Sequence, residues 1–208
     1  MKVARTVWGG GKVGDDLKDL PIAKSAYFER KNISQGWHTF GKEVITMNEK
    51  KRYYIAYGSN LNVEQMMRRC PGAKPIGTAM LEHNILYFSG SGSGYYLTIE
   101  PKIGNKVSVA VWEITSKDEE ALDRYEGYPR FYYKYDYTLK VTLLDEKTTK
   151  ELRCFAYIMT EGRRVGLPTN YYLTTCMKGY KDFGFDTRIL TRTVERMKKI
   201  SWKQLRLK

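Results

Sequence analysis

Residues 53–61 read Tyr-Tyr-Ile-Ala-Tyr-Gly-Ser-Asn-Leu, an apolar stretch that runs into a Gly-Ser-Asn turn. The pattern predicts a strand over 53–57 and a helix over 62–70. A buried strand that stops beside a helix start leaves backbone N–H groups without internal partners, so this turn suits a small anion such as a carboxylate or phosphate. The structural alternative is an ordinary capped helix, because Ser and Asn are favoured N-caps in any protein.

Composition sets limits on the class of protein. The 208 residues, 42% of them hydrophobic, suffice for one domain with a proper core. Neither a membrane helix nor a signal-peptide core is present in the sequence, so we expect no membrane partner. The three cysteines match no zinc or disulfide spacing, which favours a cytoplasmic protein. With only His38 and His83, a histidine-based metal centre or a Ser-His-Asp triad has little material, and we expect no metal and no cofactor.

The net charge of +13 is concentrated at the C-terminus. Residues 188–208 hold eight Lys/Arg against the single Glu195, and their spacing predicts an amphipathic basic helix. Such a helix is either a solvated surface element or a contact for nucleic acid, an acidic protein or a membrane surface. Only one aromatic residue, Trp202, is available there for base stacking, which disfavours a nucleic-acid partner.

The chain divides into three parts by pattern. Residues 1–50 sustain no period and are predicted to be an extension that is docked or partly disordered. Residues 51–187 form the predicted domain, and 188–208 form the basic helix. A capped helix is predicted over 117–125, with Ser116 as N-cap and Glu119 as its capping-box partner, and a second helix over 171–183. Strands and one Ser/Gly-rich loop (89–94) fill the rest: 73–81, 85–88, 95–100, 106–114, 131–144 and 150–159.

Many short strands, few helices and no βαβ alternation predict an α+β fold. Its architecture is expected to be a small, mostly antiparallel, partly closed β-barrel flanked by short helices.

A second informative stretch reads Leu122-Asp123-Arg124-Tyr125-Glu126-Gly127-Tyr128-Pro129. Glu126 lies at the end of the predicted short helix, among tyrosines. Such a carboxylate loses hydration, which raises its pKa and makes it a better base near neutrality. The structural alternative is a surface Glu next to a C-cap Gly.

Together these stretches closely resemble the gamma-glutamylcyclotransferase-like family. The resemblance rests on 57–61 and 122–129, on Thr98-Ile99-x-Pro101, on the Val-x-Val-x-Val-Trp-x-Ile strand 107–114, and on Leu167-Pro168-x-x-Tyr171. It covers roughly residues 52–185, and the Glu-Gly-Tyr-Pro form is similar to the branch acting on gamma-glutamyl amines.

The resemblance implies a cyclotransferase that releases 5-oxoproline from a small gamma-glutamyl amine or peptide. The substrate's own alpha-amine would attack its gamma-carbonyl, with Glu126 as the general acid/base. The resemblance places Tyr57, Gly58, Ser59, Asn60, Leu61, Tyr132 and Tyr171 at the substrate.

The leaving amine stays open between a gamma-glutamyl amino acid, gamma-glutamyl-epsilon-lysine, a gamma-glutamylated polyamine or biosynthetic intermediate, and glutathione. A homodimer also stays open. The alternative function is a non-catalytic protein on the same fold that binds a small anion or metabolite and contacts a partner through the extension and the basic tail. Retention of Glu126 favours the enzyme.

Overall fold

The computed structural model describes residues 51–206 except 93 and 146–147, so the predicted extension 1–50 lies outside the described residues. Its elements are β1 (Arg52–Ala56), η1 (Ser59–Leu61), α2 (Val63–Arg69), β2 (Lys74–Ser91), β3 (Gly94–Ile114), α3 (Ser116–Glu126), β4 (Tyr132–Leu143), β5 (Thr149–Met159), β6 (Arg164–Val165), α4 (Asn170–Asp182) and α5 (Arg188–Arg206).

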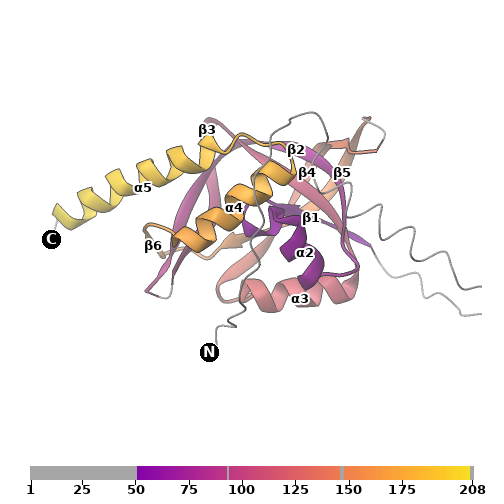
Figure 1. Ribbon diagram of the computed structural model, residues 1–208, viewed down its shortest axis with the longest axis horizontal. Helices are drawn as coiled ribbons and strands as arrows, with labels where there is room; N and C mark the ends of the chain where they lie inside the picture. Colours follow the sequence, from indigo (N-terminus) through magenta and orange to yellow (C-terminus); the bar gives the residue numbers. More distant parts are fainter. Residues whose placement is uncertain (1–50, 93, 146–147, 207–208) are drawn as a thin grey trace, which may run out of the picture.

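Five strands close a barrel (Figure 1). The order is β3-β1-β5-β4-β2, and pairing of β2 with β3 completes the ring, while β6 adds to the outside of β2. Every pairing is antiparallel except the parallel pair β1–β5. The predicted α+β fold, a mostly antiparallel barrel with short helices, is confirmed, and the ring closes where only partial closure was expected.

The β2–β3 hairpin differs from the prediction of four short strands and a Ser/Gly loop. β2 and β3 are each continuous, with an irregularity between Glu82 and Asn84. The expected loop 89–94 is mostly paired strand, because Ser91 pairs with Gly94 and leaves a two-residue turn. A Cβ on Gly90 would lie 2.0 Å from the Gly94 carbonyl oxygen, so glycine permits this close approach.

The core lies between the barrel strands and the helices that cover them. β3 was expected to alternate through Val107, Val109 and Val111, yet Ser108, Ala110 and Trp112 are buried as well. The strand is therefore covered on both faces, one by the barrel and the other by helices. The Trp112 ring meets the Phe183 ring edge-on, at 5.9 Å between centroids, just after α4.

The N-cap of α3 is one residue earlier than predicted. Thr115 caps the helix, and its partner in the capping box is Asp118 rather than Glu119. Asp118 Oδ2 accepts from the Thr115 amide at 3.0 Å, and Oδ1 accepts from the Gly72 amide at 3.1 Å. Glu119 is thereby free for ion pairs. α3 ends at Gly127, whose φ of 66° is the left-handed conformation expected of a C-cap glycine.

α4 packs directly on the turn η1. A Cβ on Gly179 would lie 2.5 Å from the Asn62 nitrogen and 2.6 Å from the Leu61 carbonyl carbon. Asp182, at the end of the same helix, accepts a hydrogen bond of 3.0 Å from the Val63 amide. The position of η1 therefore depends on α4.

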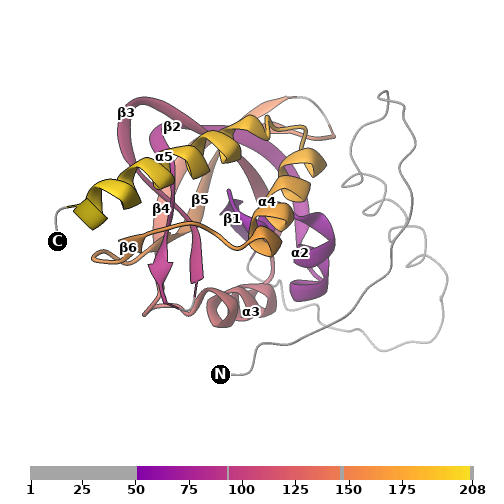
Figure 2. The same cartoon turned by 60° about the vertical axis from the view of Figure 1, so that its left-hand side comes forward.

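α5 lies against β2 and β6 and extends beyond the barrel (Figures 1 and 2). Leu190, Thr193 and Met197 are buried on its inner side. The exposed side carries basic residues: Arg188, Arg192, Lys198 and Lys199. The predicted amphipathic pattern agrees with this burial, whereas the predicted domain boundaries stay predictions. Over the part of the chain that the structure describes, no helix is long and apolar enough to cross a membrane.

We expect Gly179→Ala to destabilise the protein by about 1–3 kcal/mol, because the added methyl group forces α4 away from backbone atoms of η1. Thr174→Ala is the matched control, since Thr174 lies on the exposed side of the same helix. Denaturant unfolding measures both. Equal stability of the two variants would show that α4 adjusts without displacing η1.

Candidate active site

The Gly-Ser-Asn turn forms one turn of 3-10 helix before α2 begins. The amides of Leu61 and Asn62 donate to the carbonyls of Gly58 and Ser59, each at 3.0 Å. The amides of Ser59 and Asn60 precede these bonds and are the donors that a helix start leaves for other acceptors. The Asn62 side chain caps α2 by accepting from the Gln65 amide at 3.0 Å.

Asn60 joins this turn to Glu126. Its Nδ2 donates 2.7 Å hydrogen bonds to Glu126 Oε1 and to the Tyr54 hydroxyl. Its Oδ1 accepts from Arg69. Because a guanidinium only donates, the Asn60 oxygen must face Arg69, and the amide nitrogen must face the carboxylate. The two informative stretches of the sequence therefore meet through one side chain whose orientation is determined.

Glu126 is a carboxyl group whose pKa lies near neutral pH. Burial raises the pKa of Glu126 to about 7, against the opposing effects of the Arg69 charge and of the hydrogen bond from Asn60. Loss of hydration thus outweighs both stabilising partners. This is the direction expected from its position among tyrosines. Such a group can take up and return a proton at physiological pH.

Two connected hollows surround Glu126. The inner cavity measures about 30 Å³ and is lined by Tyr57, Gly58, Ser59, Asn60, Leu97, Glu126, Tyr132, Tyr157 and Tyr172. The outer groove measures about 350 Å³ and is lined by Ser59, Tyr96, Arg124, Tyr125, Glu126, Gly127, Phe131, Tyr132 and Tyr172. Both share Ser59, Glu126, Tyr132 and Tyr172. A ligand larger than a few water molecules must therefore occupy the inner cavity together with the near end of the groove.

The backbone of Leu97 gives two tyrosine hydroxyls opposite roles. Its amide donates to the Tyr172 hydroxyl at 3.1 Å, and its carbonyl accepts from the Tyr132 hydroxyl at 2.9 Å. The Tyr172 proton is thus left for another acceptor, while the Tyr132 oxygen keeps lone pairs for a donor. The sulfur of the neighbouring Cys176 is only a weak acceptor for the Tyr172 proton.

The structure brings most of the predicted site residues together. Besides Glu126, the residues Tyr57, Gly58, Ser59, Asn60 and Tyr132 line the inner cavity. Leu61 does not, because its side chain is fully buried in the core.

Tyr171 also lies elsewhere, since it is 77% exposed, and its neighbour Tyr172 lines the cavity instead. The helical period held a signal for this difference. The buried residues Thr175, Cys176 and Gly179 share a face of α4 with Tyr172 rather than with Tyr171.

Sequence reasoning also missed Leu97, Tyr157 and Arg69. Leu97 contributes through its backbone. Arg69 contributes through its hydrogen bond to Asn60 and its contact with the ring of Tyr125, which belongs to a distant helix. No local pattern marks either kind of residue.

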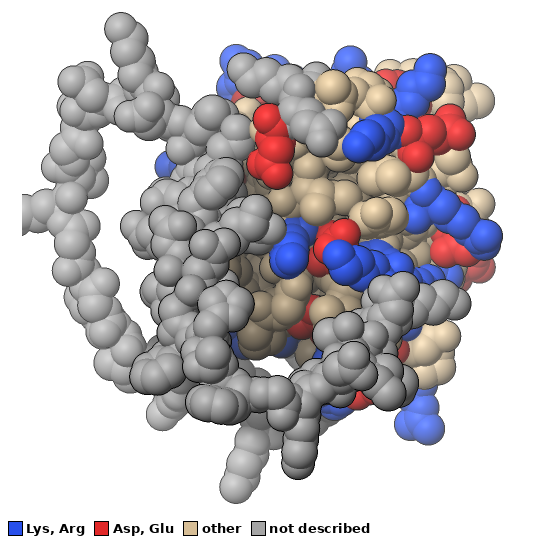
Figure 3. Space-filling model, turned by 90° about the vertical axis from the view of Figure 1, so that its right-hand side faces the viewer, with Lys and Arg blue, Asp and Glu red and all other residues tan. Residues whose placement is uncertain are grey.

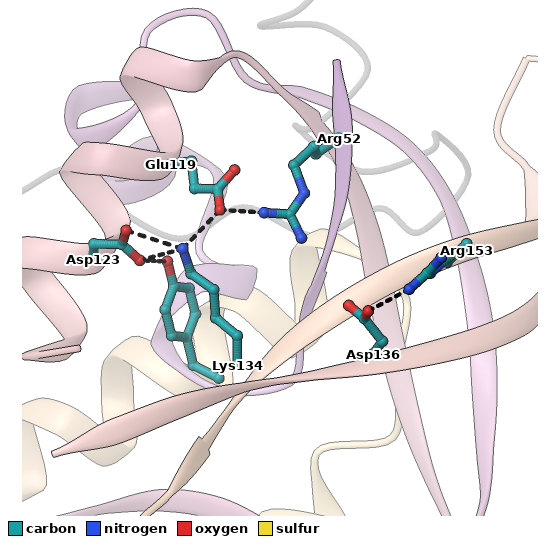
Figure 4. Close-up of polar contacts among 7 residues, drawn as sticks. Arg52, Glu119, Asp123, Lys134, Asp136 and Arg153 are labelled. Carbon is teal, nitrogen blue, oxygen red and sulfur yellow. Dashed lines mark hydrogen bonds and ion pairs between the residues drawn. The ribbon is translucent and has the colours of Figure 1, made fainter. Parts of the chain in front are cut away.

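A network of ion pairs fastens α3 to the barrel (Figure 4). Lys134 Nζ lies 2.7 Å from Glu119 Oε1 and 2.7 Å from Asp123 Oδ1. Arg52 of β1 pairs with the same Glu119. The Tyr157 hydroxyl donates to Asp123 Oδ1 at 2.5 Å. Because Asp123 precedes Glu126 by one helical turn and Tyr157 lines the inner cavity, the network holds both the helix and the cavity wall.

The environment of Lys134 is confined. Its ammonium lies 4.6 Å from the centroid of the Tyr128 ring and 5.7 Å from that of Tyr157. The side chains of Lys134, Glu119 and Asp123 are only 17%, 15% and 28% exposed. Removing this cation would therefore leave the poorly hydrated Asp123 carboxylate without its ion pair, and Glu119 with Arg52 alone.

Comparison with known proteins covers this whole site. Residues 54–174 match the family described as Gamma-glutamyl cyclotransferase, AIG2-like, and include every residue of the inner cavity. A human protein named Gamma-glutamylcyclotransferase is 29% identical over 150 residues, which cover 69% of this chain and 77% of the human protein. A bovine protein of the same name is 30% identical over 153 residues, covering 70% and 79%.

A solved structure named Gamma-glutamyl cyclotransferase has the same fold. It is 26% identical to this chain, with a TM-score of 0.59, and the match covers 69% of this chain and 86% of that one.

We expect Lys134→Met to lower the free energy of unfolding by roughly 3 kcal/mol, because the apolar stem is kept while Asp123 loses its cation and Glu119 keeps Arg52 alone. Lys140→Met is the matched control on the same strand, at an exposed position, with an effect within about 0.5 kcal/mol. Adding Asp123→Asn to Lys134→Met should restore part of the loss, because it removes the carboxylate that has lost its cation. Equal unfolding curves for the two single variants would contradict a stabilising role of the network.

Proposed function

This chain belongs to the gamma-glutamyl cyclotransferase, AIG2-like family, and we propose that it releases 5-oxoproline from a gamma-glutamyl amine or peptide with Glu126 as the general acid/base. Family membership makes it an enzyme with a cyclotransferase function on a small gamma-glutamyl substrate. One observation carries the mechanism: the Glu126 carboxylate, hydrogen-bonded by Asn60, lies between the turn η1 and the tyrosines with a pKa of about 7.

The proposed step needs no nucleophile from the protein. Glu126 takes a proton from the alpha-ammonium of the substrate, and the freed amine attacks the gamma-carbonyl carbon. The new C–N bond closes the five-membered ring, and Glu126 passes the first proton to the nitrogen of the leaving amine as the bond to that amine breaks. The carboxylate then takes the second proton from the ring nitrogen, which leaves a neutral lactam, and this proton goes to the released amine, which departs as an ammonium ion. Orientation supplies much of the rate gain, because both reacting groups belong to one molecule.

The cysteines support a route through the substrate's own amine. Burial raises the pKa of the Cys70, Cys154 and Cys176 thiols to about 12. A thiol with such a pKa stays protonated at neutral pH and is a poor nucleophile. All three are also buried, and none lines the inner cavity or the outer groove.

The turn η1 supplies donors for the anionic parts of the substrate. The amides of Ser59 and Asn60 begin the turn beside the cavity, where they suit the glutamyl alpha-carboxylate or the oxyanion that develops on the gamma-carbonyl oxygen. In this assignment the absence of a side chain at Gly58 leaves room beside the Tyr172 hydroxyl, because a Cβ there would lie 3.2 Å from that oxygen.

The two hydroxyls set by Leu97 complement these amides. Tyr172 keeps a proton that it can donate to a carboxylate or an oxyanion. Tyr132 keeps lone pairs that can accept from the substrate ammonium or amine. We therefore assign to Tyr172 the glutamyl contact that the sequence placed at Tyr171. Tyr57 contributes its ring to the wall, because its own hydroxyl donates to the Tyr157 carbonyl.

The observations favour catalysis over the alternative of an anion-binding protein on this fold. A carboxylate in the centre of a site repels an anionic ligand, whereas proton transfer requires one. On the face shown in Figure 3, Lys and Arg are interspersed with Asp and Glu over the described surface.

We expect Glu126→Gln to fold and to lose essentially all activity on a panel of gamma-glutamyl amines, with 5-oxoproline followed by mass spectrometry. The amide keeps the shape of the side chain but cannot take up the proton. For the wild type, kcat/KM should fall about tenfold per pH unit below pH 7, because the basic form is lost. Turnover that survives in Glu126→Gln would exclude this residue as the base.

The same variant should be more stable than the wild type at pH 8. The pKa of Glu126 is about 7 in the folded protein and near its ordinary value of 4.5 in the unfolded chain. The folded state therefore binds the extra proton between these values, so wild-type stability falls as the pH rises through them. Gln has no proton to lose, and Glu126→Gln should gain on the order of 3 kcal/mol at pH 8 relative to pH 4. Chemical unfolding at both pH values measures this difference.

Tyr172→Phe should lower kcat/KM by about 10–100-fold, since it removes one hydrogen-bond donor from the bound anion. Tyr171→Phe is the matched control from the next position and should leave kcat/KM unchanged. A larger loss of kcat/KM in Tyr171→Phe than in Tyr172→Phe would show that Tyr171 makes the glutamyl contact.

A further inference from the structure

We propose that the leaving amine carries a large apolar or aromatic group and no positive charge. The inference rests on the proposed function and concerns the outer groove, which receives the part of the substrate that the inner cavity cannot hold. It selects among the leaving groups that the sequence left open, and it disfavours polyamines, which keep a free ammonium when one nitrogen is acylated.

The outer end of the groove is built from rings. Tyr96, Tyr125 and Phe131 line the groove but not the inner cavity. The Tyr96 ring packs edge-on against Tyr172 at 5.1 Å and against Phe131 at 6.2 Å between centroids. Phe131 in turn lies 5.4 Å from Tyr132. Rings held by one another form a fixed apolar wall, which suits a ring or a branched apolar group on the leaving amine.

Three arginines lie close to this wall. The guanidinium carbon of Arg69 lies 3.3 Å from the centroid of the Tyr125 ring, and that of Arg163 lies 3.8 Å from the centroid of Phe131. Arg124 lines the groove itself. The one carboxylate among the groove residues is Glu126, which the proposed mechanism reserves for the substrate alpha-ammonium.

Aromatic walls alone would also suit a cation, because ring faces attract positive charge. In this groove two of the rings already contact a cation, because Tyr125 and Phe131 each have a guanidinium over the ring. A second cation in the groove would meet these two charges and Arg124, with no further carboxylate among the groove residues to offset them. Repulsion therefore outweighs the ring attraction, and an uncharged or anionic leaving group is favoured.

Two pairs of matched substrates separate the apolar effect from the charge effect. Gamma-glutamyl phenethylamide and gamma-glutamyl ethylamide differ by the ring, whereas gamma-glutamyl butylamide and gamma-glutamyl putrescine differ by the terminal ammonium. We expect kcat/KM of the full-length enzyme to be at least about tenfold higher for the phenethylamide and for the butylamide within their pairs. The readout is 5-oxoproline released at several substrate concentrations at pH 7.5.

Charge reversal at the groove supplies a second measurement. Arg124→Glu should lower the ratio of kcat/KM for the butylamide to kcat/KM for the putrescine derivative by about fivefold or more. It should leave the corresponding ratio for the phenethylamide and the ethylamide unchanged. Arg192→Glu makes the same change of charge on the exposed side of α5 and should alter neither ratio. Both positions are exposed, so folding should persist.

The possible results separate the specificity inference from the proposed function. Turnover of all four amides with ratios near one, or equal ratios in the two charge variants, would overturn the specificity inference and leave the cyclotransferase function standing. A preference for putrescine would overturn it as well. No turnover of the four amides, beside turnover of another gamma-glutamyl amine or peptide, would overturn the inference alone. No turnover of any gamma-glutamyl compound would overturn the proposed function, and the inference with it.

Discussion

The hydrogen bond between Asn60 and Glu126 is the contact on which the site depends. It joins a turn that follows the first strand to a helix end 66 residues later, and its direction is imposed by Arg69 on the other side of the amide. Around it the fold supplies two supports. α4 presses on the turn through Gly179, and the Lys134 network fastens α3 to the barrel. Moving either support would move one partner of this bond relative to the other.

The electrostatics of the site follow from an unequal division of charge. Lys134 lies between two carboxylates on the inner side of α3, whereas Glu126 at the end of the same helix has no ion pair with any residue that the structure describes. Arg69 acts on Glu126 through Asn60 and over the Tyr125 ring. Glu119 and Asp123 therefore anchor the helix, whereas Glu126 is available for proton transfer. The two roles differ because a cation contacts the first two carboxylates but not the third.

Local patterns predicted the elements well and their assembly less well. The strand 53–57, the helix before Glu126 and the apolar β runs are visible in the sequence because burial imposes their periods. The parallel pairing of β1 with β5 and the closure of β2 on β3 are not visible, since they join distant residues. The break expected in each long strand followed from Ser, Gly and charged residues, which a curled hairpin accommodates at its bulge and tip. Tyr171 was chosen by motif spacing, and burial along α4 shows why Tyr172 lines the cavity.

The backbone of Leu97 makes the β2–β3 hairpin part of the chemistry. Leu97 is paired with Phe88, and this alignment directs its amide and carbonyl toward the two tyrosines. In an antiparallel ladder, residues alternate between pairs that bond to the partner strand and pairs whose amide and carbonyl point away from it. A one-residue insertion at the Gly92 turn that shifted the pairing would therefore turn both the amide and the carbonyl of Leu97 toward β2 and away from the two tyrosines. The alignment of the hairpin, set by a turn outside the cavity, thus determines whether the two hydroxyls keep their opposite roles.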